Sequence, residues 1–540
     1  MFTTAERAAT ARARLEEARS SFRGRLAAHG PPALWSRFTG RIAAVLAGGG
    51  ARGAYEAGAL LAVQDAAVPT QLITATSIGA INGASFAAHG EGLVGNAEPL
   101  VNAWFELTPP TVGVEWTRYS WMVVGLLATA FGIANLTYYL IDSGGYHIHL
   151  HHPALAWASL FMAGASVMLF YDQMPYVYFV IQRLVRRSQW RPSRRRLAIS
   201  VGANLLVVSF VAALIESLHV HTDFDELLHG KPLLLALILA GLFVLQRVRR
   251  RMHPNLGHFW GRILRMPFRT GIFTNFERIR FLRRWIPADR LRASAIRIVL
   301  TATDLDTGAP RYFTNVDPES FRGEPGVDER FVAREVVRLD DLMPAIVASS
   351  ALPIAYEPLI LDGHLHGDGA IVGSQPIRPA IRLGADVLLI ISMESPGGPT
   401  GAVRTFVDVG LRALDILMQR NVQDDVTLLA NANRQIEKAA ATLGVRPEDV
   451  VIEFEGRRFR YVKAFSVRPS QPITNTILEF GGRATEEAIV RGYEDAAVRI
   501  EELASYVATG GFRSDLQVLV LQVVKPAPGT PRALGGPSPS

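Results

Sequence analysis

Residues 72–83 read LITATSIGAING, and the fold of the chain is organised around this stretch. Its first residues are apolar and β-branched, which predicts a strand, and the small residues after Ser77 predict a tight turn that opens a helix over 78–88. Ala75 and Gly79 stand two residues before and two residues after Ser77, the spacing that a nucleophile elbow requires where strand and helix cross. The Ser77 hydroxyl is therefore expected to be exposed at a helix N-terminus, where the helix dipole favours developing negative charge.

A glycine-rich turn lies upstream, between a predicted strand over 42–47 and a predicted helix over 54–66. Successive glycines allow several backbone N–H groups to point at one anion, so the turn can hold a phosphate or an oxyanion. The Lys-Ser/Thr ending of a nucleotide P-loop is missing, which disfavours the phosphate alternative. The turn consists of Gly48, Gly49, Gly50, Ala51, Arg52 and Gly53.

A third feature lies far downstream, where Asp368 stands between two glycines in the sequence GDGA (367–370). With the glycine-rich turn and the Ser77 stretch, it resembles the patatin-like phospholipase family: a GGGxRG loop, a GxSxG-type elbow and a DG[GA] aspartate, in that order. The resemblance covers 41–88 and 296–392. It implies an α/β fold, a three-layer α/β/α domain with a central, mostly parallel sheet.

The resemblance also implies roles for individual residues. Ser77 would be the nucleophile and Asp368 the base that takes its proton, in a Ser–Asp dyad without histidine. Backbone N–H groups of Gly49, Gly50 and Ala51 would hold the negative oxygen of the tetrahedral intermediate, and no cofactor or metal is required. The motif residues that complete the prediction are Gly48, Arg52 and Gly53 in the loop, Ala75 and Gly79 at the elbow, and Gly369 and Ala370 after the aspartate. Ala75 stands where glycine is usual in the family.

Plainer roles stay open for three of these residues. Ser77 could be a structural helix cap, and Asp368 could form an ordinary Asp-Gly turn. Arg52 could either anchor the glycine loop or meet a lipid phosphate.

Histidines offer two further alternatives. His364 and His366 alternate with Asp368, so a histidine base or a metal site is an option, although the flanking glycines predict a turn that breaks the strand. Asp304 and Asp306 are interpreted as structural loop residues. A second candidate metal set comes from the histidine-bearing loops at 142–153 and 219–231.

The composition indicates a membrane protein. Hydrophobic residues make up 49% of the 540 residues, and the mean hydropathy is +0.18, which is too apolar for an ordinary soluble enzyme. There is no cysteine, which excludes disulfides and thiolate catalysis. A bilayer core needs about 20 apolar residues per helix, so a membrane insert of four helices is predicted, with a short fourth stretch that is alternatively re-entrant or buried. The apolar stretches are 121–141, 154–181, 197–218 and 232–246.

Charge predicts the orientation of this insert. The net charge is +7, and arginines cluster at 183–196 and 247–251 beside apolar stretches, with no nucleic-acid motif. We therefore expect anionic lipid, and not nucleic acid, as the partner. The histidine-bearing loops contain one lysine and no arginine, so the positive-inside rule places the arginine clusters in the cytoplasm. The predicted location is the bacterial inner membrane, multi-pass, with a cytoplasmic catalytic domain.

These features predict a domain order along the chain. The order begins with an N-terminal extension, a solvated helix (1–40), followed by the first part of the patatin-like domain (41–110) and the membrane insert (111–252). An interfacial amphipathic segment, alternatively a core helix, comes next (253–290). The second part of the patatin-like domain with C-terminal helices (291–510) and a largely disordered tail (511–540) complete the chain.

The predicted function is that of a membrane-bound serine lipid acyl hydrolase of the phospholipase or lysophospholipase type, acting on a lipid ester. One alternative is a lipid acyltransferase with the same dyad. Another is a catalytically silent membrane scaffold or transporter that keeps the fold, against which the intact Ser77, Asp368 and glycine loop argue. The sequence leaves the oligomeric state open.

Overall fold

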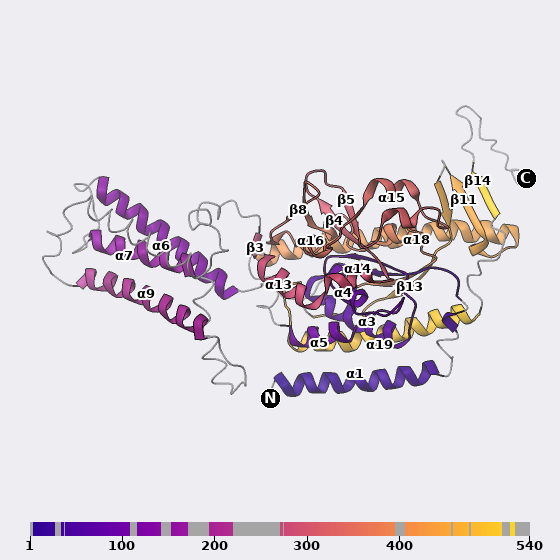
Figure 1. Cartoon of the computed structure of the whole chain (residues 1–540), viewed down its shortest axis with the longest axis horizontal. Helices are drawn as coiled ribbons and strands as arrows, with labels where there is room; N and C mark the ends of the chain where they lie inside the picture. Colours follow the sequence, from indigo (N-terminus) through magenta and orange to yellow (C-terminus); the bar gives the residue numbers. More distant parts are fainter. Residues whose placement is uncertain are drawn as a thin grey trace, which may run out of the picture. The chain divides into compact units, whose positions relative to one another are not determined.

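The chain forms two compact units, residues 1–114 with 273–540 and residues 115–272, in a computed structural model (Figure 1). The residues that the structure describes are 4–27, 34–36, 38–107, 116–141, 153–170, 194–219, 271–273, 275–394, 406–454, 457–474, 477–509 and 519–523.

The first unit is built on a nine-stranded sheet with the order β13-β10-β1-β2-β4-β5-β6, to which β9 and β8 are added. The neighbours from β13 to β4 pair in parallel, whereas β5 and β9 pair antiparallel to β4. The strands are β1 (Ile42–Leu46), β2 (Leu72–Thr76), β4 (Arg297–Asp304), β5 (Pro310–Thr314), β6 (Val336–Arg338), β8 (Leu359–Leu361), β9 (His364–Asp368), β10 (Val387–Ile391) and β13 (Lys463–Val467). Short strands outside this sheet are β3 (Gly271–Phe273), β7 (Ile354–Tyr356), β11 (Val450–Phe454), β12 (Arg457–Arg460) and β14 (Leu519–Val523).

Helices cover both faces of the sheet. Leu46 and Ile73 lie under α4 on one face, where a Cβ atom added to Gly83 would be 2.9 and 3.0 Å from them. On the other face, Val45 and Leu72 belong to a buried cluster shared with α17 and α18. A mostly parallel sheet between two helical layers confirms the expected α/β/α fold. The helices of this unit are α1 (Thr4–Ala27), α3 (Gly53–Asp65), α4 (Ile78–Ala88), α5 (Glu98–Glu106), α13 (Asn275–Trp285), α14 (Ala288–Ala293), α15 (Glu329–Glu335), α16 (Met343–Ser349), α17 (Ile377–Arg382), α18 (Phe406–Leu443) and α19 (Arg483–Ala508).

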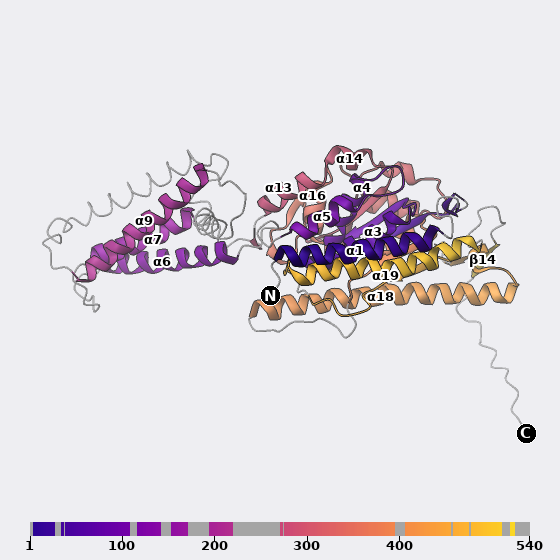
Figure 2. The ribbon, with the colours of Figure 1, turned by 90° about the horizontal axis from the view of Figure 1, so that it is seen from below.

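The N-terminal helix is not simply solvated, which corrects the prediction for that segment. Leu15, Phe22 and Leu26 of α1 are buried, and the Phe22 ring packs edge-on against Tyr493 of α19, with 5.9 Å between ring centroids. Figure 2 shows α1 alongside α19. These apolar residues lie on one helical face, so many charged residues of the helix cover the remaining surface.

The second unit contains α6 (Trp116–Ile141), α7 (Pro153–Phe170) and α9 (Arg194–His219), and α7 contacts both of the others. Helices α6 and α7 approach closely at glycine, because a Cβ atom on Gly132 would lie 2.6 Å from the backbone nitrogen of Phe161. Large apolar side chains such as Leu127 of α6 and Leu205 of α9 are more than half exposed, at 64% and 61%. Small residues at helix contacts and apolar outer surfaces are typical of helices packed in lipid.

By length and composition, one described helix is able to cross a membrane: α9, over Leu197–Leu214, with a mean hydropathy of 2.3. The apolar parts of α6 and α7 are shorter, at Val123–Tyr138 and Leu155–Val167. The insert with four spans therefore stays a prediction. Several features predicted around it lie outside the described residues, namely the fourth apolar stretch, both histidine-bearing loops, nearly all of both arginine clusters and residues 253–270, as does the tail from 524.

The contact between α3 and α19 depends on two glycines. A Cβ atom on Gly58 of α3 would lie 1.9 Å from the carbonyl oxygen of Ile489, and one on Gly492 of α19 would lie 1.8 Å from that of Tyr55. Any side chain at these positions forces the two backbones apart.

We expect Gly492→Ala to lower the free energy of unfolding by about 2 kcal/mol, because overpacking separates these helices. The control is Gly24→Ala in α1, where an added Cβ atom meets nothing within 4 Å. That change should raise stability by about 0.5 kcal/mol, as alanine is the better helix former. Thermal denaturation of the purified full-length variants measures both. Equal shifts in Tm would contradict the packing described for α3 and α19.

Candidate active site

Ser77 occupies a strained turn between β2 and α4. Its backbone angles are φ 55° and ψ −122°, in a region that residues with a side chain rarely adopt. Gly79 permits the close crossing of strand and helix, since a Cβ atom there would lie 2.7 Å from the carbonyl oxygen of Leu46. The methyl group of Ala75 is fully buried and has room towards α4. Even a Cβ atom added to Gly83 would lie 3.7 Å from it, an ordinary contact distance. Alanine therefore fits where the family usually has glycine.

Two strands that meet end to end bring Ser77 to Asp368. β2 pairs with β4 as far as Thr76, which lies opposite Thr301. β9 runs in the other direction and ends with Asp368 opposite Ala302, while β5 occupies the other edge of β4. The first residue after β2 and the last residue of β9 are therefore neighbours. Ser77 Oγ donates a hydrogen bond of 2.7 Å to Asp368 Oδ2 across a sequence separation of 291 residues.

Asp368 is fully buried and held on several sides. Its Oδ1 atom accepts a hydrogen bond of 2.9 Å from the backbone of Ala370, and its carbonyl oxygen accepts one of 2.7 Å from Thr303 Oγ1. A Cβ atom on Gly369 would lie 2.1 Å from the carbonyl oxygen of Thr301, so only glycine fits there. Burial raises the pKa of Asp368 to about 6, against the opposing effects of the Ala370 and Ser77 hydrogen bonds and of the charge on Arg278.

The glycine loop presents two unused donors beside Ser77. The N–H of Gly48 donates to the carbonyl of Ser374 at 2.8 Å, and that of Ala51 donates to Ile477 at 2.9 Å. Among the described residues, the N–H groups of Gly49 and Gly50 have no acceptor. The inclusion of Ala51 as an oxyanion donor was therefore wrong, because its N–H is already taken by the backbone carbonyl of Ile477.

Arg52 anchors the loop, the first of its two predicted roles. Its guanidinium donates two hydrogen bonds, of 2.9 and 2.5 Å, to the carboxylate of Asp415 in α18, and both side chains are buried. Gly53 begins α3 and leaves room for Ile78, whose Cγ1 atom would lie 2.4 Å from an added Cβ atom. Of the six loop residues, Gly49 and Gly50 are thus the oxyanion candidates, and the others hold the loop in place.

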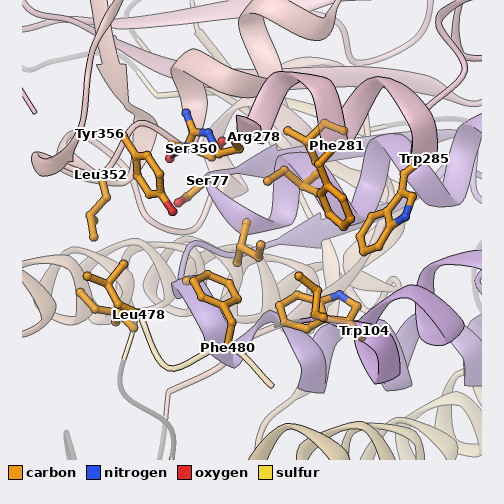
Figure 3. A pocket seen from close by; sticks show the side chains of 16 residues that line it. Ser77, Trp104, Arg278, Phe281, Trp285, Ser350, Leu352, Tyr356, Leu478 and Phe480 are labelled. Atoms are coloured by element: carbon orange, nitrogen blue, oxygen red, sulfur yellow. Dashed lines mark hydrogen bonds between the residues drawn. The ribbon is translucent and has the colours of Figure 1, made fainter. Parts of the chain in front are cut away.

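An apolar pocket opens beside Ser77 and encloses about 720 Å³ of space, part of it open to solvent. Aromatic rings from separate elements line it and are drawn with Ser77 in Figure 3. Trp104 of α5 stacks on Phe480 with 6.1 Å between centroids, and Phe281 lies 4.1 Å from Trp285 within α13. The elbow motif predicted an exposed hydroxyl, but Ser77 is only 5% exposed. Its side chain lines this pocket and does not face open solvent. The pocket suits a hydrocarbon chain ending at the serine.

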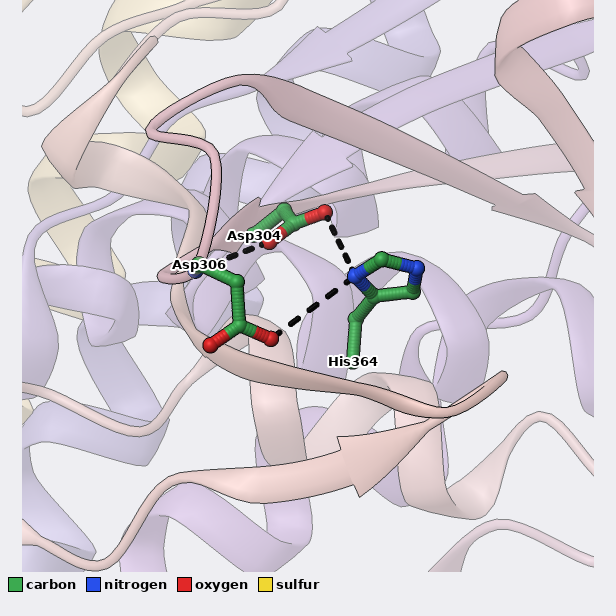
Figure 4. A group of neighbouring side chains, drawn as sticks. All are labelled: Asp304, Asp306 and His364. Carbon is green, nitrogen blue, oxygen red and sulfur yellow. Dashed lines mark hydrogen bonds and ion pairs between the residues drawn. The ribbon is translucent and has the colours of Figure 1, made fainter.

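The histidines of β9 lie apart from the Ser77–Asp368 hydrogen bond. The predicted break of this strand at Gly367 was wrong, because pairing with β4 continues to Asp368. His366 is buried with its ring edge against Phe313, at 5.4 Å between centroids. His364 lies on the surface, 3.5 Å from Asp304 and 3.7 Å from Asp306 (Figure 4).

The two aspartates near His364 have structural bonds. Asp304 Oδ1 accepts hydrogen bonds from the backbones of Asp306 and Thr307, and Asp306 Oδ2 accepts one from Leu365. These bonds support the structural interpretation of both aspartates.

Two buried side chains near the site were not predicted. Glu56 accepts a hydrogen bond of 2.8 Å from Asn82, which in turn accepts one of 3.0 Å from the ring nitrogen of Trp104. Burial raises the pKa of Glu56 to about 8, so it is neutral at pH 7 and joins the loop helix, the elbow helix and the pocket wall. The sequence feature that could have indicated a buried Glu56 is its position as a single acid within the apolar stretch of α3. Arg278 of α13 lines the pocket. Its burial could not be predicted from the sequence, because the segment contains several arginines and no local pattern distinguishes this one.

Comparisons with known proteins give a match to one family model and a solved structure of low similarity. No curated protein matches the chain. The crystal structure of VipD from Legionella pneumophila is similar at 11% sequence identity and a TM-score of 0.31, over 86% of this chain and 67% of that chain. A family model described as patatin-like phospholipase matches residues 44–381, more than half of the 540 residues. The chain therefore belongs to the patatin-like phospholipase family, whose members are lipid acyl hydrolases.

Proposed function

We propose that this protein is a membrane-bound serine hydrolase that cleaves lipid esters through an acyl-Ser77 intermediate. The observation that carries the proposal is the hydrogen bond of 2.7 Å from Ser77 Oγ to the buried carboxylate of Asp368, beside an apolar pocket. A serine hydroxyl is a weak nucleophile until a neighbouring base takes its proton, and Asp368 is in position to do so.

The reaction has two halves. In the first, Ser77 Oγ attacks the ester carbonyl, its proton moves to Asp368, and the N–H groups of Gly49 and Gly50 bind the oxyanion. Collapse of the intermediate returns the proton to the leaving alcohol and leaves the acyl group on Ser77. In the second, water loses a proton to Asp368 and attacks the acyl carbonyl. Collapse of this second intermediate returns the proton from Asp368 to Ser77 Oγ, releases the fatty acid and restores the serine hydroxyl. Each oxyanion donor contributes on the order of 3 kcal/mol to transition-state stabilisation.

The substrate class follows from the pocket. Its aromatic and aliphatic walls offer burial to a hydrocarbon chain, at about 0.8 kcal/mol per CH₂ group. A phospholipid, a lysophospholipid or another long-chain ester meets this requirement. A lipid acyltransferase would form the same acyl-Ser77 intermediate and differ only in the acceptor, so product analysis with and without added alcohol separates the two activities.

The membrane part of the proposal is supported by the second unit. Its outer helices expose large apolar side chains, including Val124 and Phe131 of α6 and Val208 of α9 at 55%, 57% and 62%. Exposed apolar surface on this scale calls for a covering partner, and lipid suits helices of this composition. The arginine clusters of the sequence favour the cytoplasmic side of the membrane. The protein would therefore be held in a bacterial inner membrane by its second unit, with the catalytic unit in the cytoplasm.

A serine-directed fluorophosphonate probe is expected to label the purified wild-type protein and leave Ser77→Ala unlabelled, because only an activated hydroxyl displaces fluoride. Gel fluorescence measures the labelling. Ser85→Ala is the control, since Ser85 is buried in the same helix α4 outside the dyad and the variant should label as wild type does. Equal labelling of wild type and Ser77→Ala would remove Ser77 as the nucleophile.

The pH dependence tests the base. Asp368 must be ionised to accept a proton, so kcat/KM should rise with pH through an apparent pKa of about 6, the value to which burial raises this carboxyl group. Asp368→Asn should lose at least about 100-fold in kcat, because general base catalysis is worth roughly 100-fold to 10,000-fold. A pH-rate profile on a soluble ester measures both. Wild-type activity in Asp368→Asn would exclude this carboxylate as the base.

Topology has its own test. A reporter domain fused after Arg196 is expected to be cytoplasmic, and one fused after His229 is expected on the outer side. Protease accessibility in intact cells and in opened cells measures each position. A reporter after Arg196 that is digested in intact cells would overturn the proposed orientation.

A further inference from the structure

Arg278 is a buried cation held by neutral hydrogen-bond acceptors. It is 3% exposed, and no carboxylate in the described part of the chain forms an ion pair with it. Its Nη2 atom donates hydrogen bonds of 2.8 Å to the carbonyl of Val347 and to Asn275 Oδ1, and Nη1 donates to the carbonyl of Ser350. The guanidinium lies over the Tyr356 ring, 4.1 Å from its centroid. An isolated buried charge is costly, so its retention calls for a function.

The carbonyls that Arg278 binds belong to the segment that holds both members of the dyad. Val347 and Ser350 stand at the C-terminal end of α16, where backbone carbonyls lack partners within the helix. Between them, Ser349 Oγ accepts a hydrogen bond of 3.0 Å from the backbone N–H of Ser77. One residue further, the carbonyl of Ala351 accepts a hydrogen bond of 3.1 Å from the N–H of Asp368. Residues 347–351 therefore touch both reacting partners, and Arg278 fixes this segment at two points.

The charge of Arg278 also lowers the pKa of Asp368, by less than the hydrogen bonds from Ala370 and Ser77 do. The groups that bind Asp368 from the other elements are neutral: Ser77 Oγ and the backbone N–H of Ala370 donate to its carboxylate, and Thr303 Oγ1 donates to its backbone carbonyl. A positive charge favours the ionised carboxylate, and burial disfavours it. Burial lowers the pKa of Arg278 to about 10, which leaves the guanidinium protonated at neutral pH.

We propose that Arg278 is a positioning residue of the Ser77–Asp368 dyad: it clamps the end of α16 that holds both residues, and its positive charge favours the ionised form of Asp368. The inference rests on the proposed function of the dyad. It assigns to α13 a role in the reaction through residues 347–351, without contact between Arg278 and the reacting atoms.

Two substitutions separate the clamp from the charge. Arg278→Met removes both, and we expect kcat to fall about 100-fold, since misplacement of reacting groups by about 1 Å has that effect. The acid limb of the pH-rate profile should move to higher pH, because a charge that favours the ionised carboxylate is lost. Arg278→Lys keeps the charge and loses the two-point clamp, so kcat should fall about tenfold with the acid limb unchanged.

The control is Arg283→Met in the same helix, where the arginine is 58% exposed and pairs with Asp341 at 3.0 Å. It should leave kcat, KM and the acid limb at their wild-type values. Steady-state kinetics on a soluble ester between pH 4.5 and pH 9, with Tm recorded for every variant, gives all the readouts.

The inference is overturned when Arg278→Met lowers Tm but keeps the wild-type acid limb, which is the outcome for a purely structural arginine. Where Arg278→Met does not yield folded protein, Arg278→Lys decides, and wild-type kcat in that variant contradicts the clamp. Failure of the proposed function has a different signature: wild-type protein that neither hydrolyses esters nor reacts with the fluorophosphonate.

Discussion

The site depends on how three strands share hydrogen bonds. β4 pairs along one edge first with β2 and then with β9, and these two strands run in opposite directions until their ends meet. A slip of one residue in the β4–β9 pairing would turn the carboxylate of Asp368 to the other face of the sheet, and a slip in the β2–β4 pairing would displace Ser77. The register of β4 therefore sets the position of Ser77 relative to Asp368 and makes their hydrogen bond possible.

Burial has two opposing effects at this site. It supplies a dry, apolar pocket that suits a lipid chain, and it disfavours the charge that Asp368 would carry as the proposed base. The hydrogen bond from Ala370 and the charge of Arg278 restore part of that charged state. The resulting pKa of about 6 suits a base that works near neutral pH, because the carboxylate is ionised there while it retains basicity.

Local patterns were enough to predict the parts of the site that depend on neighbouring residues. The elbow at Ser77, the glycine loop and the aspartate at 368 all follow from small residues at fixed spacings, and α4 begins and ends as predicted. Features that depend on distant contacts were not predicted. Gly367 lies within a strand because β4 supplies its partner, and the Ala51 N–H is taken by Ile477. Arg278 and Glu56 gain their roles only through burial by residues far away in the sequence.

The central claim is that Ser77 carries the acyl group during turnover. Peptide mass spectrometry after an acid quench, on enzyme turning over a slowly hydrolysed fatty-acyl ester, tests it most directly. The account predicts that the peptide containing Ser77 gains the mass of the acyl group and loses it again when substrate is exhausted. Turnover without an adduct on Ser77, or with an adduct on a different residue, would contradict it.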